Sequence, residues 1–328
     1  MIEQGSVICL DSNCIKVKEK DGSRRSVPIE TIEGISVFGN IQVTTQCINE
    51  CLRKGIMLNF YSQNGSYFGC LESTGHIHAE RQRMQDRLHN TEFALGLGKR
   101  IMQGKVKNQQ VLLHRYSRDR DIDISSENKM LKICYQKIED AKSIEQLIGY
   151  EGTAAKNYFM GLNKLVDPEF HFQGRSKRPP RDSFNSMLSL GYSILLNEIY
   201  GSIQNRGLNP YFGFVHQDKE NHPTLASDLM EEWRPVIVDS VVMSLVNGHE
   251  IKKNHFRTDN EMPGIYLTNE GMKIFINKLR KKMLTSCKYL VYVDYAVSFR
   301  RAMDLQVSQL IKAIEAEDYT LYYPMIIR

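Results

Sequence analysis

The stretch Tyr67-Phe68-Gly69-Cys70-Leu71-Glu72-Ser73-Thr74-Gly75 marks where this chain changes character, because strand patterning stops within it. After about residue 78, apolar residues recur at spacings of three and four, as they do along helices. The change predicts an α+β protein, with a β domain over residues 1–75 and a larger all-α domain over residues 76–328. At 328 residues the chain is long enough for two such domains.

Short apolar runs separated by turn residues fill the first 75 positions. Asn64-Gly65 lies between the runs 57–60 and 67–71, which predicts a hairpin. Further strands are expected near 7–10, 15–17, 27–29, 35–37 and 41–43. One helix is expected over about 45–54, ended by Gly55.

The rest of the chain has a helical pattern. Helices are expected near 78–117, 128–140, 143–165, 183–206, 224–246, 269–283 and 298–316. In the fourth of these, Phe184, Met187, Leu188 and Leu195 fall on one face, which is most simply a core-facing stripe.

Composition predicts an ordinary cytoplasmic protein. The chain is 41% hydrophobic and 25% charged, and its net charge of +5 is too small to argue for nucleic acid on its own. The seven cysteines form no CxxC pair and are expected to be reduced thiols. There is no signal-like N-terminus and no apolar run of about 20 residues, so no membrane association is expected.

Glu151 is the first residue that points to chemistry. It follows Leu147 and Ile148 at helical spacing, and small residues come directly after it. A carboxylate in this setting faces either a site or solvent, and the segment alone leaves the two interpretations about even.

His216 lies in the segment 209–216, whose proline, glycine and aromatic residues are typical of a loop that presents a side chain. Other histidines, among them His76, His78, His222 and His255, are expected to be structural. The acids that follow His216 set it apart.

Those acids are Asp228, Glu231 and Glu232. On a helix Asp228 and Glu231 project to one side, where a bound cation would offset their repulsion. Asp228 is alternatively a helix N-cap, Glu232 is expected to be solvated, and Arg234 can pair with any of the three. With Glu151 and His216 the acids predict a site for Mg²⁺ or Mn²⁺ rather than Zn²⁺, since oxygen ligands with one nitrogen suit these ions.

Two basic clusters accompany these residues. Arg175, Lys177, Arg178 and Arg181 lie in a proline-broken loop between Glu151 and His216 in the sequence. The loop is expected to line the same cleft and to hold a phosphate backbone. The second cluster spans 273–282 on a late helix, and such runs are more often solvated faces.

Four segments, in this order, resemble the CRISPR-associated integrase/endonuclease family, whose members insert new spacers into a CRISPR array. Gly149-x-Glu151-Gly152, followed by Tyr158-Phe159, is similar to its first motif. The segments 181–192, 207–216 and 225–235 are similar to its central helix, histidine motif and acidic motif. The segments 37–40, 55–60 and 105–109 extend the resemblance over essentially the whole chain.

The resemblance implies a β-sandwich-like N-terminal domain, through which the protein dimerises, and an all-α catalytic domain. It makes Glu151, His216 and Glu231 the metal ligands and Asp228 a supporting acid. It gives Glu232 no role. The layout is most similar to members that accompany type I systems, in particular subtype I-C.

The function implied is that of a metal-dependent DNA endonuclease and integrase, in which a 3′-hydroxyl attacks a phosphodiester. The implied partners are double-stranded DNA (protospacer and CRISPR repeat), a second copy of the chain and a small CRISPR adaptation protein. Two other hypotheses stay open. One is a non-catalytic DNA-binding scaffold subunit whose acids are surface charge, and the other is a general metal-dependent nuclease for branched DNA or RNA.

Overall fold

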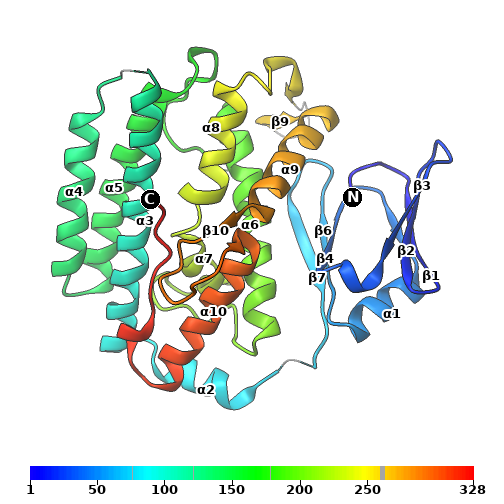
Figure 1. Ribbon diagram of the computed structural model, residues 1–328, viewed down its shortest axis with the longest axis horizontal. Helices are drawn as coiled ribbons and strands as arrows, with labels where there is room; N and C mark the ends of the chain where they lie inside the picture. The colour runs from blue at the N-terminus through cyan, green and yellow to red at the C-terminus, as the bar shows by residue number, and fades with distance from the viewer. Residues whose placement is uncertain (76, 121, 178, 259–262) are drawn as a thin grey trace. The chain divides into compact units, whose positions relative to one another are not determined.

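The computed structural model describes residues 1–75, 77–120, 122–177, 179–258 and 263–328. The chain divides into two compact units, Met1–Ile77 and His78–Arg328. The first is rich in strands and the second in helices (Figure 1), so the expected α+β class is confirmed.

The described residues of the smaller unit form two sheets and one α-helix. The first sheet has the order β3 (Arg24–Pro28), β2 (Cys14–Lys18), β1 (Val7–Asp11) and β5 (Gln42–Val43), and the second has the order β4 (Gly34–Phe38), β6 (Met57–Tyr61) and β7 (Tyr67–Leu71). Helix α1 (Thr45–Arg53) begins after Thr44, whose side chain accepts a hydrogen bond from the amide of Cys47. Gly55 follows the helix with a φ of 69°, as a residue that ends a helix often does.

The expected hairpin between β6 and β7 is confirmed, because the two strands pair antiparallel. The strands on either side of Gly39-Asn40 do not pair with each other: β4 pairs parallel with β6, and β5 pairs parallel with β1. Ile8, Val37, Cys47 and Leu58 belong to one buried cluster. Both sheets and α1 therefore share one core.

The larger unit is mostly helical. Its helices are α2 (Ala79–Arg87), α3 (Glu92–Arg120), α4 (Ser125–Asp140), α5 (Ile144–Leu165), α6 (Ser183–Asn205), α7 (Thr224–Met230), α8 (Ser240–Asn247), α9 (Asn269–Leu284) and α10 (Phe299–Glu315). Two short hairpins also occur, β8 (Phe256–Thr258) with β9 (Ile265–Leu267) and β10 (Ser286–Cys287) with β11 (Val297–Ser298). The larger unit is therefore helical as expected, with these two short strand pairs added.

Two of the expected helices are broken. The one expected over 78–117 is α2 and α3, and between them Asn90 adopts a φ of 58°, a left-handed conformation that ends a helix. The one expected over 224–246 is α7, then a π-helical turn η3 (Pro235–Asp239), then α8. Pro235 starts the turn, since proline has no amide hydrogen to continue the α-helical bonding.

Helices α3, α4 and α5 pack against one another, and α6 packs against α7, α10 and η3 (Figure 1). Most of α6 is buried, so this helix forms the centre of the larger unit. None of the helices in the described part of the chain is long and apolar enough to cross a membrane.

Candidate active site

Glu151 lies in α5. This helix begins after Ser143, whose hydroxyl accepts a hydrogen bond from the backbone amide of Gln146. Its side chain is 19% exposed and faces α3 rather than open solvent. There its carboxylate contacts the ammonium of Lys105. Of the two sequence interpretations, the solvent-facing acid is therefore wrong.

Lys105 joins two of the predicted residues. Its side chain is 7% exposed, and its ammonium nitrogen lies 2.5 Å from Oε2 of Glu231 while also contacting Glu151. Burial lowers the pKa of this ammonium, but Glu151 and Glu231 outweigh that effect and raise the pKa. A single cation thus faces carboxylates from α5 and from the end of α7.

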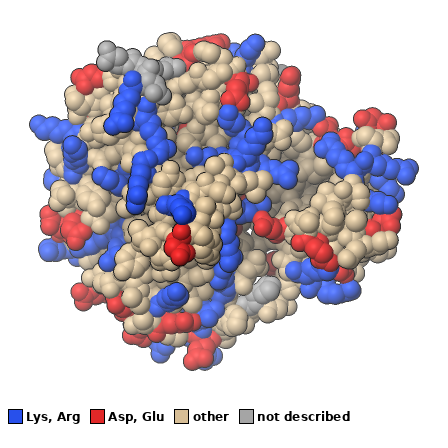
Figure 2. Space-filling model, in the orientation of Figure 1, with Lys and Arg blue, Asp and Glu red and all other residues tan. Residues whose placement is uncertain are grey.

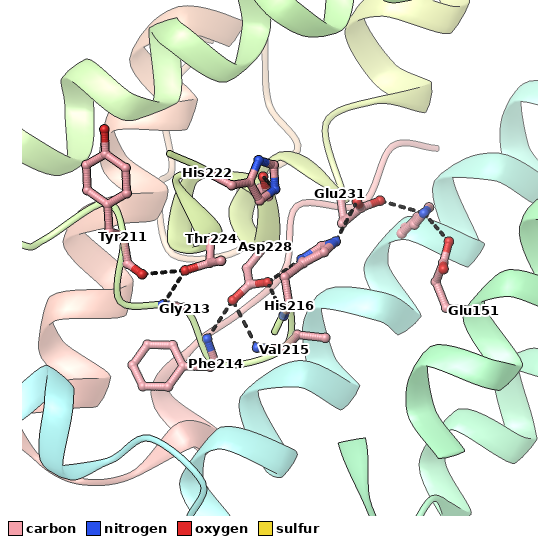
Figure 3. A network of polar contacts seen from close by, with 12 residues as sticks. Glu151, Tyr211, Gly213, Phe214, Val215, His216, His222, Thr224, Asp228 and Glu231 are labelled. Carbon is pink, nitrogen blue, oxygen red and sulfur yellow. Dashed lines mark hydrogen bonds and ion pairs between the residues drawn. The ribbon is translucent and has the colours of Figure 1, made fainter. Parts of the chain in front are cut away.

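His216 is held by Asp228. The backbone amides of Phe214 and Val215 donate to Asp228 Oδ2 at 2.7 and 3.0 Å, and the amide of His216 donates to Oδ1 at 3.0 Å. Nδ1 of His216 lies 2.6 Å from the same Oδ1 (Figure 3). Burial lowers the pKa of the imidazole, but the hydrogen bond and charge of Asp228 outweigh that effect and raise it.

This arrangement gives Asp228 a definite place. It is fully buried within α7 and accepts bonds from the histidine loop, so the alternative that it is a helix N-cap is wrong. Because Asp228 occupies Nδ1, the other ring nitrogen of His216 is directed to Glu231, with Nε2 3.7 Å from Oε1.

Glu231 is 3% exposed and is surrounded by cations. Its Oε1 lies 3.1 Å from Arg234 Nη2, so the expected pairing of Arg234 with one of the acids is confirmed. Burial alone would raise the pKa of this carboxyl. Arg234, then Lys105 and His216, outweigh burial and hold the pKa at about 2. The carboxylate is therefore ionised at any working pH.

Glu232 is not solvated, and that expectation is wrong. Its side chain is fully buried, where the Tyr322 hydroxyl and the Met325 amide donate to it at 2.7 and 3.0 Å. Burial raises its pKa to about 8, against the opposing effect of these hydrogen bonds. Glu231 and Glu232, adjacent in sequence, thus lie in opposite electrostatic settings.

A cavity of about 650 Å³ unites most of the predicted residues. Its polar lining includes Lys105, Glu151, His216, Glu231, Arg234, Arg175 and Lys177. Phe159, Met160 and Phe172 line it with apolar surface. The expectation that the basic loop reaches the same cleft holds for Arg175 and Lys177. Arg181 is exposed and does not line the cavity, and Arg178 lies outside the described residues.

Tyr192 supports the basic wall of this cavity. The guanidinium groups of Arg234 and Arg175 lie 4.8 and 5.3 Å from the centre of its ring. Its hydroxyl donates to Asp239 at 2.6 Å, and that of Tyr158 donates to the same carboxylate at 2.7 Å. Burial raises the pKa of Asp239 to about 6, against the opposing hydrogen bonds of the two tyrosines.

The predicted metal ligands lie close to one another around Lys105. Within the described ranges, no three His, Cys, Asp or Glu side chains are already grouped closely enough to hold an ion. Even so, Glu151 and Glu231 face one cationic atom, the ammonium nitrogen of Lys105, which marks a position that a metal cation could take. Two carboxylates and one imidazole nitrogen are a donor set that fits Mg²⁺ or Mn²⁺.

Sequence reasoning did not assign Lys105, Tyr192 or Asp239 to the site. For Lys105 a signal exists, because it lies four residues after Ile101 and three after Met102, on the apolar side of α3. A lysine at such a position must meet buried acids. No comparable pattern singles out Tyr192 or Asp239.

Known proteins resemble most of the chain. Residues 1–281 match the model of the family described as CRISPR associated protein Cas1. A CRISPR-associated endonuclease Cas1 of Mycobacterium tuberculosis is 37% identical over 292 residues, which are 88% of this chain and 85% of that protein.

Two solved structures share the fold. A CAS1 protein from Thermotoga maritima has a TM-score of 0.81 at 24% identity, covering 96% of each chain. A chain of a Cas6-RT-Cas1–Cas2 complex has a TM-score of 0.85 at 24% identity, covering 99% of this chain and 35% of that one. On the family match and the identity to a curated relative, this chain belongs to the Cas1 family of CRISPR-associated proteins.

Proposed function

We propose that this protein is a divalent-metal-dependent DNA endonuclease and integrase that inserts spacer DNA into a CRISPR array. The observation that carries the proposal is the convergence of Glu151 and Glu231 on one cationic position, in a cavity that Arg175 and Lys177 also line. Negative ligands for a metal and positive groups for a phosphate backbone occur together there, as phosphoryl transfer requires.

Glu151, Glu231 and Nε2 of His216 would hold Mg²⁺ or Mn²⁺. When bound, such an ion lowers the pKa of an attacking hydroxyl and stabilises charge on the phosphate oxygens. Asp228 would fix the ring of His216 by accepting a hydrogen bond from its Nδ1–H, which leaves Nε2 to bind the ion. Arg234 would keep Glu231 ionised.

The chemistry proposed is a transesterification. The 3′-hydroxyl of the incoming DNA loses its proton and forms a new bond to phosphorus. The bond from that phosphorus to the 3′-oxygen of the target strand breaks, and this leaving oxygen takes up a proton. With water in place of the 3′-hydroxyl the same site hydrolyses DNA. Arg175 is suited to hold a phosphate, since Asn185 and Ser189 accept hydrogen bonds from it at 2.9 and 3.1 Å and restrict its position.

The apolar side of the cavity is suited to a base next to the reacting phosphate. Phe159, Met160 and Phe172 offer the kind of surface on which nucleobases stack. The proposed partners are double-stranded DNA (protospacer and CRISPR repeat), a second copy of this chain that associates through the N-terminal domain, and a second Cas protein. A structural neighbour that occurs in a Cas6-RT-Cas1–Cas2 complex supports the last of these.

The test is a strand-transfer assay with a short duplex and a plasmid that carries a CRISPR repeat, with and without Mn²⁺. Glu151→Gln is expected to abolish metal-dependent transfer, whereas Glu145→Gln, an exposed acid in the first turn of the same helix, is expected to leave it unchanged. Full activity of Glu151→Gln would overturn the proposal.

The same assay separates the two competing functions. A scaffold subunit binds DNA equally well without metal and with His216→Ala, and it forms no covalent product. A general nuclease for branched DNA or RNA cleaves in a metal-dependent manner but yields no strand-transfer product.

A further inference from the structure

A second cavity lies in the larger unit and shares no lining residue with the first. It has a volume of about 440 Å³ and is formed by residues of α3, η3, α9, β10 and the last two residues of the chain. One of its lining residues is Lys282, which belongs to the basic cluster over 273–282. The proposed active site does not include this cluster.

The lining of this cavity is cationic. Arg115, Lys282, Lys288 and Arg328 all contribute to it, and none of its described lining side chains is acidic. Arg115 donates a hydrogen bond to a main-chain oxygen of Arg328, the last residue described, so its guanidinium already has one oxygen partner and three further cationic side chains remain beside it. Figure 2 shows lysine and arginine side chains spread over the face that carries α9 and the C-terminal end of the chain in Figure 1.

Lys282 is the cationic side chain of this cavity that is best placed to bind an anion. It is half-buried, and its ammonium lies 4.8 Å from the centre of the Phe299 ring. In the parts of the chain that the structure describes, no acidic side chain lies within ion-pair distance of it. Lys278, one turn earlier on α9, contacts Glu250.

The electrostatics agree with this geometry. Burial, and then the charge of Arg115, lowers the pKa of the Lys282 ammonium. Positive charges held near one another destabilise the folded chain when negative groups do not fully offset them. A bound anion would remove that cost.

We propose that this cavity binds a phosphate group, between the guanidinium of Arg115 and the ammonium of Lys282. Guanidinium and ammonium groups together are the usual ligands of phosphate oxygens. Arg115, Ser286, Lys288 and Arg328 are exposed, so the cavity opens to solvent and admits a phosphate that is part of a polymer.

Two sources supply this chemistry, the backbone of a nucleic acid and free inorganic phosphate. The first rests on the proposed function, under which the protein holds DNA during strand transfer. A phosphate contact remote from the reacting bond would position the duplex without reading its sequence.

The experiment compares Lys282→Gln with Lys281→Gln, an exposed lysine next to it on the same helix. Binding of a fluorescent DNA duplex is measured by anisotropy over a range of salt concentrations. We expect Lys282→Gln to weaken binding roughly tenfold. We also expect it to reduce the slope of log affinity against log salt by about 1, as the loss of one phosphate contact does. Lys281→Gln is expected to retain the wild-type values.

A second arm uses inorganic phosphate alone and follows the melting temperature. A phosphate-dependent rise that Lys282→Gln loses, with DNA binding unaffected, supports the site and assigns it to free phosphate. Arg115→Gln serves as the second variant, from a different element, in case Lys282→Gln does not fold. The proposal is overturned if both variants match Lys281→Gln in DNA affinity, salt slope and response to phosphate.

The outcome is separable from that of the proposed active site. Mn²⁺ binding and the effect of Glu151→Gln depend on the first cavity alone, since the two cavities have no lining residue in common. If the protein cleaves DNA with metal but neither Lys282→Gln nor Arg115→Gln changes DNA affinity, salt slope or the response to phosphate, the phosphate site is refuted and the proposed function still stands.

Discussion

The ammonium nitrogen of Lys105 lies 2.5 Å from Oε2 of Glu231, in a position where it also contacts Glu151. Replacing Lys105 with Met would leave two buried like charges facing each other. Because breaking a buried ion pair from one side costs about 3–5 kcal/mol, we expect a fall of this size in the free energy of unfolding. Urea denaturation without divalent ions measures it.

The matched control is Lys107→Met, an exposed lysine on the same helix, which is expected to change stability by less than about 0.5 kcal/mol. Adding Mn²⁺ is expected to restore part of the loss in Lys105→Met. Equal stability of the two variants would contradict the importance of the Lys105 bridge.

Asp228→Asn is expected to lower the pKa of His216. The negative charge of Asp228 stabilises the protonated imidazole, so its removal leaves burial, which favours the neutral form. A charge-assisted hydrogen bond of ordinary strength corresponds to a change of about one to two pKa units. An NMR titration of the ring measures the change, with the exposed Asp218→Asn in the same loop as control. An unaltered His216 titration would show that Asp228 does not act on the ring.

Glu232 is expected to make stability depend on pH. Its pKa is about 8 in the folded chain and about 4.5 when unperturbed, so the folded state binds the proton more tightly. The free energy of unfolding should therefore fall as pH rises from about 4.5 to about 8, by up to about 1.4 kcal/mol per pH unit, and then level off.

Glu232→Gln, which cannot ionise, should flatten this dependence and be the more stable protein at pH 8. Denaturation in the presence of EDTA at several pH values tests this, with the exposed Glu220→Gln as control. If Glu232→Gln and Glu220→Gln have the same pH profile, the buried carboxyl is not the cause.

Two glycine substitutions test the helix packing around the site. A Cβ atom at Gly191 would meet Val238 Cγ1 at 2.5 Å, so Gly191→Ala should destabilise the protein by about 1–3 kcal/mol. At Gly149 nothing lies within 4 Å, and alanine suits a helix better than glycine, so Gly149→Ala should add about 0.5–1 kcal/mol. Thermal denaturation of the two variants measures whether each substitution raises or lowers stability. A loss of stability in Gly149→Ala would contradict the open space around this position of α5.

Local pattern was enough to predict most of the larger helices. Helix α5 begins and ends almost where its apolar spacing does, because Ser143 caps it and its buried stripe is regular. The breaks at Asn90 and Pro235 were missed because the apolar spacing continues across both. Residue chemistry and motif order singled out Glu151, His216, Glu231 and Asp228 as candidates. Their contacts with Lys105 and Arg234 could be seen only in the folded structure.

Residues whose role depends on distant partners were not predictable in this way. Glu231 and Glu232 are adjacent, so the local sequence does not distinguish them. The burial of Glu232 depends on Tyr322 and Met325, which lie about ninety residues later in the chain. The subtype I-C assignment, dimerisation through the N-terminal domain and the role of Arg178 stay predictions.

The contrast between Glu231 and Glu232 has a consequence for mutational screens. Asn108 donates hydrogen bonds to the carbonyls of Glu232 and Met325 and accepts one from the amide of Ile327, so the backbone beside Glu231 is joined to the last residues of the chain. If the proposed function holds, substitution of Glu231 would score as inactive in an assay of CRISPR immunity, and so would substitution of Glu232 by a residue that cannot fill its buried, hydrogen-bonded position. Only a parallel measure of protein abundance would separate a lost ligand from a chain that the cell degrades.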